Sequence, residues 1–278
     1  MIMNLHTHTC HSYDGADETV AERVQAAKAL GLQIMAVTDH VELNRYYPAE
    51  AYGAEENEQF TYHFSDAYAQ SVYFTEKEQQ RCEGLKLLCG AEFGQIMQAP
   101  DIANALYQAD TRLDIVLASV HELNGMPDFY YLDYSKLDIP ALITQYFDEV
   151  LATAQTDCYD VLAHLTYPLR YIPDRQAYDI TPHLPVIDEI FRTLIAKEKA
   201  LELNGSGLRY DKPFTDPDLP LIHRFREMGG KYLTVSTDAH SEKYLGFGID
   251  KLEEMARQAG FSALTYFEKH QPHFVPLG

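Results

Sequence analysis

The sequence of 278 residues contains no tryptophan and few basic residues, with 22 lysines and arginines against 42 aspartates and glutamates. Its formal charge of −20 leaves no basic patch to neutralise phosphates, so we expect no DNA or RNA partner. No stretch reaches the roughly 18 apolar residues that cross a bilayer. Since no basic segment precedes an apolar one at the N-terminus, we expect neither a signal peptide nor a membrane partner.

The few cysteines form no CxxC pair and are too sparse for a disulfide scaffold. We interpret Cys10, Cys82, Cys89 and Cys158 as reduced thiols of a cytoplasmic protein. The sequence also lacks internal repeats, low-complexity tracts and linkers, and its hydrophobic content of 46% is normal for a globular protein. We therefore expect residues 1–278 to form a single domain.

Short apolar runs between polar residues are typical of buried parallel strands. They predict strands at residues 2–5, 34–37, 85–89, 115–120, 161–163, 200–203 and 232–235. Helical patterns lie between them, at residues 17–30, 65–81, 101–108, 138–154, 181–199, 216–228 and 249–258. This alternation with short connections predicts a parallel α/β barrel. Two longer irregular segments, residues 41–61 and 122–137, would lie on its catalytic side and could form substrate walls.

Six of the predicted strands lead into a histidine or an acid. In α/β barrels, side chains at the carboxyl ends of successive strands converge on one rim. His6 and His8 are two residues apart on a strand and point to the same face, and Asp238 and His240 repeat the spacing. The other strand ends contribute His40, Glu92, His121 and His164. This pattern predicts a metal site with several ions.

The chemistry of these side chains restricts the metal. Imidazole with carboxylate suits zinc, iron or manganese, whereas magnesium and calcium prefer oxygen ligands. A carboxylate such as Glu92 can bridge two ions, and ions about 3.5–4 Å apart are a common device for hydrolysing phosphate esters. Asp14 is either a further ligand or a turn residue before Gly15. Asp39 should point away from His40 and have a structural or supporting role.

The remaining histidines lie away from the strand ends. We expect His11 to neighbour the site without binding metal. We interpret the others as surface or core residues: His63, His183, His223, His270 and His273.

Taken together, the motifs resemble the PHP (polymerase and histidinol phosphatase) superfamily. They are His6-Thr7-His8-Thr9, Asp14-Gly15, Thr38-Asp39-His40, Gly90-Ala91-Glu92, Ser119-Val120-His121, Ala163-His164 and Ser236-Thr237-Asp238-Ala239-His240. The resemblance covers nearly the whole chain and implies a distorted seven-stranded, TIM-like β/α barrel with three divalent ions. It implies the ligands His6, His8, Asp14, His40, Glu92, His121, His164, Asp238 and His240.

Finer features resemble the stand-alone histidinol-phosphatase branch. The segment 201–209 and the Asn124-Gly125 pair after His121 are similar to that branch. The resemblance implies that Arg170 and Arg209 bind phosphate, and guanidinium groups suit phosphate oxygens; the alternative for each is a surface salt bridge. The segment 165–170 and the stretch 126–129, which lacks a tryptophan, depart from the branch and leave the substrate open.

The expected reaction is metal-assisted hydrolysis of a small phosphomonoester, with L-histidinol phosphate as the first choice. A metal-bound water, Asp238 or His240 could protonate the leaving oxygen, and the sequence favours none of them. Tyr46, Tyr171 and Tyr210 are candidates for substrate recognition. The alternatives are a PHP enzyme for a sugar phosphate, nucleotide or phosphotyrosine, and a non-catalytic barrel that binds metal or ligand. The sequence does not indicate the oligomeric state.

Overall fold

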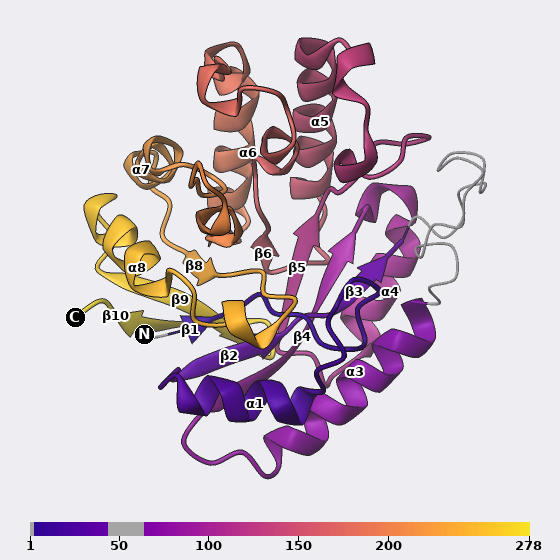
Figure 1. Cartoon of the computed structure of the whole chain (residues 1–278), viewed down its shortest axis with the longest axis vertical. Coiled ribbons are helices and arrows are strands. Elements are labelled where there is room, and N and C mark those ends of the chain that lie inside the picture. The colour runs from indigo at the N-terminus through magenta and orange to yellow at the C-terminus, as the bar shows by residue number, and fades with distance from the viewer. Residues whose placement is uncertain (1–2, 44–63) are drawn as a thin grey trace.

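The predicted apolar runs form the parallel strands of a nearly closed barrel in the computed structural model, which describes residues 3–43 and 64–278 (Figure 1). The strands pair in the order β1-β2-β4-β5-β6-β7-β8. Their bounds are Met3–Asn4, Ile34–Val37, Lys86–Gly94, Ile115–Ser119, Val161–Leu162, Ala200–Asn204 and Leu233–Ser236. A hydrogen bond of 3.2 Å from Leu5 N to Val235 O joins β1 to β8. The seven-stranded TIM-like barrel is thereby confirmed.

Helices between the strands cover the outside of this barrel (Figure 1). They are α1 Val20–Ala29, α3 Phe64–Gln79, α4 Pro100–Ala109, α5 Ile139–Ala154, α6 Leu184–Ala196, α7 Leu219–Glu227 and α8 Ile249–Gln258. The capping box of Thr19 and Glu22 begins α1, and Gly31 follows its end with a φ of 73°. Asp138 caps α5 by accepting a hydrogen bond from Ala141 N. Local sequence signals therefore set these helix ends.

The structure corrects several predicted boundaries. Strand β4 continues through Glu92, because residues 90–94 pair with β5. Helix α7 begins at Leu219 instead of residue 216, since Asp216 is fully buried and Asp218 is the N-cap residue. A 3₁₀ turn, Thr181–His183, precedes α6. The segment predicted to be irregular from residue 41 begins with a strand, β3 His40–Glu42, which pairs with β4. The rest of that segment, with Tyr46 and His63, lies outside the described residues.

A C-terminal hairpin, β9 Ala263–Glu268 with β10 Gln271–Pro276, was not predicted. Its turn meets the chain just before β5 and β6, where His270 N donates to Asp114 O at 3.0 Å and His270 Nδ1 lies 2.8 Å from Asp160 Oδ2. The hairpin therefore covers the amino-terminal end of the strands, and the carboxyl-terminal rim stays available for a site. None of the described helices is long and apolar enough to span a membrane.

Gly90 offers a test of the packing between strands. A Cβ at this position would lie 2.8 Å from both Ile115 Cγ2 and Ile115 O, and 2.9 Å from Thr38 Cγ2. We expect Gly90→Ala to lower the free energy of unfolding by about 2 kcal/mol, because overfilled cores force neighbours out of place. Urea unfolding measures this change. Gly278→Ala, where nothing lies within 4 Å, is the control, and equal stability of both variants would contradict the prediction.

Candidate metal centre

The structure brings eight of the nine predicted ligands together at the carboxyl-terminal rim of the barrel. They form four overlapping groups. Within each group, the potential ligand atoms all lie within 4.8 Å of one another. The groups are His8-His40-His240, His6-His8-Asp238, His6-Glu92-His164 and His40-Glu92-His121. Residues from β3, from β4 and from the segments that follow β1, β5, β6 and β8 therefore share one small volume, which we call the metal cluster.

Glu92 lies at the centre of the metal cluster. Its Oε2 is 3.1 Å from His6 Nε2 and 2.9 Å from His40 Nδ1. Its Oε1 is 3.2 Å from His121 Nε2 and 3.0 Å from His164 Nε2. A carboxylate with imidazoles on both oxygens has the geometry of a bridging ligand between two metal ions.

Buried atoms without hydrogen bonds support the same assignment. Within the part of the chain that the structure describes, His6 Nε2, His8 Nε2 and Glu92 Oε2 are buried and have no hydrogen-bond partner. His8 Nε2 and Glu92 Oε2 face each other at 3.6 Å. Buried polar atoms normally find partners, and electron pairs directed at a common point are what a cation requires. The residues present therefore fit a group of divalent metal ions.

Electrostatics holds His8 and Glu92 in protonation states that suit metal ligands, whereas nearby carboxylates raise the pKa values of His6, His40 and His121. Burial lowers the pKa of His8 to about 3, and the neighbouring His240 and His40 add to that shift, so His8 is neutral at pH 7. Burial acts to raise the pKa of Glu92, but the charges of His6, His40 and His121 outweigh it and hold that pKa well below the usual range. A neutral imidazole and an ionised carboxylate are the forms that bind metal.

Asp14, the ninth predicted ligand, lies at the edge of the metal cluster. Its Oδ1 is 3.4 Å from His40 Nε2, and its Oδ2 is 3.0 Å from His240 Nε2. The side chain is 41% exposed, whereas Glu92 is 1% exposed. Asp14 can therefore reach an ion at the open side of the cluster, but it belongs to none of the four tight groups.

Backbone conformation helps to aim two of the ligands. His164 and Asp238 have positive φ values of 21° and 51°. Left-handed backbone costs a non-glycine residue about 1 kcal/mol, and such residues concentrate at functional sites. They lie two residues after the ends of β6 and β8, respectively.

A second set of carboxylates, which the sequence analysis missed, supports the histidines. His6 Nδ1 lies 2.8 Å from Glu202 Oε1, which also accepts from Ser236 Oγ at 2.5 Å. His121 Nδ1 lies 3.0 Å from Glu42 Oε1. Such contacts fix the imidazole tautomer and leave the other ring nitrogen for the metal. The signal for Glu202 was present, because an acid between Leu201 and Leu203 in a buried strand needs a partner.

Asp39 supports the cluster as expected, without binding in it. Its carboxylate accepts hydrogen bonds from Thr9 N at 2.6 Å, Ser12 Oγ at 2.8 Å and Ser71 Oγ at 2.6 Å. Ser12 Oγ in turn lies 3.0 Å from His8 Nδ1. The other described histidines lie outside the four groups: His11, His183, His223, His270 and His273. His11 stacks on Phe74 at 5.6 Å.

The two predicted arginines lie beside the metal cluster. Arg170 Nη1 is 3.3 Å from Asp238 Oδ2, and Arg209 Nη2 donates to the Asp238 carbonyl at 2.8 Å. Arg170 Nη2, Arg209 Nε and Ser206 Oγ are buried without a hydrogen-bond partner among the described residues. The alternative of a surface salt bridge is therefore wrong for Arg170, whose side chain is buried. Arg170 Nη2 and Arg209 Nε remain as donors for an anion. Ser206 was not predicted.

These arginines line a cavity of about 180 Å³, which we call the metal cavity. Tyr171 and Tyr210, both named as candidates from the sequence, also line it. Tyr13, Tyr167 and Ser206 complete its wall together with the ligands Asp14, His40, His121, Asp238 and His240. A space of this size with cations and metal ligands suits a phosphate group.

Comparison with known proteins agrees with this geometry. The PHP domain profile matches residues 4–206. The chain belongs to the PHP domain family. It is 27% identical to a probable histidinol-phosphatase of Clostridium acetobutylicum over 275 residues, 97% of this chain and 98% of that protein. It is also 27% identical to the histidinol-phosphatase of Lactococcus lactis over 272 residues, 95% and 94% of the two chains.

Two solved structures share the fold. The Lactococcus lactis histidinol phosphate phosphatase, solved with zinc, L-histidinol and phosphate, superposes with a TM-score of 0.80 at 25% identity. The match covers 98% of this chain and 100% of that chain. A protein from Listeria monocytogenes superposes with a TM-score of 0.74 over 90% of this chain and 99% of that chain; at 16% identity it supports the fold alone.

Glu202 tests the supporting layer. We expect Glu202→Gln to weaken metal binding by about 10- to 100-fold, because the amide no longer holds His6 in the right tautomer by a charged hydrogen bond. Competition with a chelator measures the affinity directly, independently of turnover. Glu254→Gln, at an exposed position on α8, is the matched control. Unchanged zinc affinity of Glu202→Gln in a folded protein would contradict the orienting role.

Asp128 gives a pH-dependent prediction. This buried carboxyl accepts from Tyr130 N at 2.7 Å, and burial raises its pKa from 3.8 to about 6. The folded protein then holds the proton more tightly than the unfolded chain, so stability falls as the pH rises from about 4 to about 6. Asp128→Asn cannot titrate, so its free energy of unfolding should not fall in this way. Relative to the wild type, it should gain at most about 3 kcal/mol between pH 4 and 7.

Urea unfolding of the metal-free protein at several pH values measures the difference. Asp211→Asn, at an exposed position, is the control. If the pH profiles of wild type and Asp128→Asn run parallel, the buried carboxyl does not titrate as stated.

Proposed function

We propose that this protein is a metal-dependent phosphomonoesterase that hydrolyses L-histidinol phosphate to L-histidinol and phosphate. The observation that carries the proposal is the metal cluster around Glu92, which faces two arginines across a cavity of about 180 Å³. The full-length similarity to histidinol-phosphatases supports the substrate. The zinc, L-histidinol and phosphate held by the Lactococcus lactis protein support the same chemistry.

We propose that three divalent ions, zinc, iron or manganese, occupy the site. The ligands would be His6, His8, Asp14, His40, Glu92, His121, His164, Asp238 and His240. When bound, such ions make a water nucleophile available at neutral pH and offset charge on the phosphoryl oxygens.

The chain's own residues would bind and orient the ester. Arg170 and Arg209 have nitrogens left for phosphate oxygens, and their stacking on Tyr167 at 4.8 Å and Tyr244 at 4.6 Å fixes the guanidinium planes. Asp238 and His240 line the same cavity, so either is placed to pass a proton to the leaving oxygen. We also propose that residues 1–278 act as one domain in the cytoplasm.

Phosphate release from L-histidinol phosphate, compared with a panel of sugar phosphates, nucleotides and phosphotyrosine, tests the proposal. We expect the highest kcat/KM for L-histidinol phosphate with added zinc or manganese, since specificity is a ratio of these values. His8→Ala and Glu92→Ala should each lower kcat/KM more than about a hundredfold. Removing a metal ligand should lower activity more than removing a residue that only supports a ligand. His273→Ala, on the distant hairpin, is the control.

Each contrary result has a defined meaning. Turnover of His8→Ala and Glu92→Ala near the wild-type level with full metal content would overturn the metal assignment. A clear preference for another ester would keep the reaction and replace the substrate. Bound metal without hydrolysis of any ester would favour a non-catalytic binding protein.

A further inference from the structure

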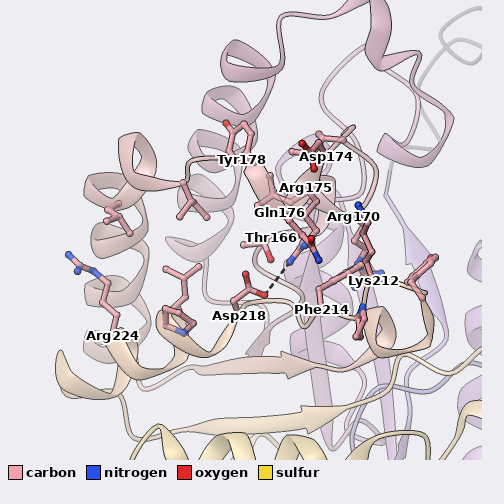
Figure 2. A pocket seen from close by; sticks show the side chains of 18 of the residues that line it. Thr166, Arg170, Asp174, Arg175, Gln176, Tyr178, Lys212, Phe214, Asp218 and Arg224 are labelled. Carbon is pink, nitrogen blue, oxygen red and sulfur yellow. Dashed lines mark hydrogen bonds and ion pairs between the residues drawn. The ribbon is translucent and has the colours of Figure 1, made fainter.

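A larger cavity lies next to the metal cavity and shares Arg170 and Tyr210 with it as walls. We call it the side pocket. Its volume is about 700 Å³, within the range of small-molecule sites. The apolar part of its wall comes from the segments after β6 and β7 and from α6 and α7, with Ile172, Tyr178, Phe214, Leu184 and Leu221. Figure 2 shows Tyr178 and Phe214 in this wall.

Cations gather in the wall of the side pocket, although acids outnumber bases almost twofold in the chain as a whole. The cations are Arg170, Arg175, Lys212 and Arg224, and the acids are Asp174, Asp218 and Glu227. Figure 2 shows Arg170, Arg175 and Lys212 towards one end and Arg224 at the other. The pocket thus combines an apolar body with a cationic end.

Arg175 is the side chain best placed to receive an anion. Its guanidinium stacks on Phe214 at 4.0 Å and its side chain is 13% exposed. Its ion-pair distances to Asp216 and Asp218 are both long, 3.4 Å, and Nη1 has no hydrogen-bond partner in the described part of the chain. A planar guanidinium with unused donors next to an aromatic ring suits a carboxylate or sulfonate attached to an apolar group.

A buried carboxylate connects the side pocket to the metal cavity. Asp216 is fully buried and accepts from Arg170 Nε at 2.5 Å and from Thr166 Oγ1 at 2.7 Å, while its Oδ1 faces Arg175. Arg170 in turn reaches Asp238 in the metal cluster. One carboxylate therefore holds both the arginine of the metal cavity and the arginine of the side pocket.

We propose that the side pocket binds a small organic anion with an apolar body, and that its occupation weakens phosphate binding in the metal cavity. Two anions on opposite sides of the Arg170–Asp216–Arg175 group share the same positive charge, so each lowers the affinity for the other. Thermodynamic linkage requires the effect to be reciprocal. Only the effect on catalysis depends on the proposed phosphatase function; binding in the pocket does not.

Anilinonaphthalene sulfonate, a fluorescent aromatic anion, is the probe. We expect the dye to bind saturably at one site per chain in the metal-loaded protein. Leu184→Trp should lower the dye affinity about tenfold because the larger side chain fills the pocket. Arg175→Gln should lower it about tenfold because it removes the positive charge. The exposed-site variants Leu30→Trp and Lys251→Gln should bind the dye as the wild type does. Circular dichroism confirms that each variant is folded.

Two measurements test the coupling. Saturating dye should raise KM for L-histidinol phosphate about fivefold with little change in kcat, and Leu184→Trp should lose this effect while keeping its basal activity. Inorganic phosphate should weaken dye binding by the same factor by which the dye weakens the binding of inorganic phosphate. In Arg209→Gln, a higher phosphate concentration should be needed for the same effect, because Arg209 lines the metal cavity and not the side pocket.

The outcomes separate this inference from the proposed function. Dye binding that neither Leu184→Trp nor Arg175→Gln weakens would overturn the pocket assignment. Binding in the pocket without any effect of phosphate on it would overturn the coupling. If the protein hydrolyses no ester, the phosphate titration of dye affinity still decides the inference.

Discussion

Glu92 is the residue on which the arrangement of the site depends. Its carboxylate is buried among the imidazoles of His6, His40, His121 and His164. A buried charge without partners would cost several kcal/mol, so this residue is tolerated only because cations or donors surround both oxygens. The barrel has to bring four separate strand ends to one carboxylate, and most other features of the rim follow from that requirement.

A regular strand holds the central carboxylate of the site. Glu92 lies within a continuous strand, held by pairing with β3 on one side and β5 on the other. Glu202 and Glu42 then fix the imidazoles from behind. Positioning within fractions of an ångström is expected where metal ligands must meet a defined geometry. The C-terminal hairpin closes the opposite end, so that the two ends of the barrel are divided between stability and chemistry.

Arg170 extends the influence of the site beyond the metal cluster. It contacts Asp238 on one side and Asp216 on the other, and it lines both cavities. An arginine whose planar group is held by a buried carboxylate loses little freedom when an anion binds, which favours recognition of phosphate. Because Asp216 contacts both arginines, an anion bound at Arg175 would also change the electrostatic potential at Arg170.

The order of chemical groups along the chain was sufficient to predict the barrel and most of the side chains that gather at its rim. Alternating apolar runs and helical patterns indicated parallel strands, and side chains at their carboxyl ends converge in any such barrel, so His6, His8 and Glu92 could be named in advance. Capping residues likewise set helix ends such as that at Thr19. These signals are local, and sequence spacing carries them.

Only the tertiary structure decided which distant side chains meet. Glu202 lies 196 positions from His6, and Asp216 lies 46 from Arg170, so no spacing rule connects them. The short strand β3 exists because β4 offers it a partner, and the hairpin forms against strands far earlier in the chain. Periodicity shows which face of a strand is buried, but burial energy and pairing across the folded barrel determine its neighbours.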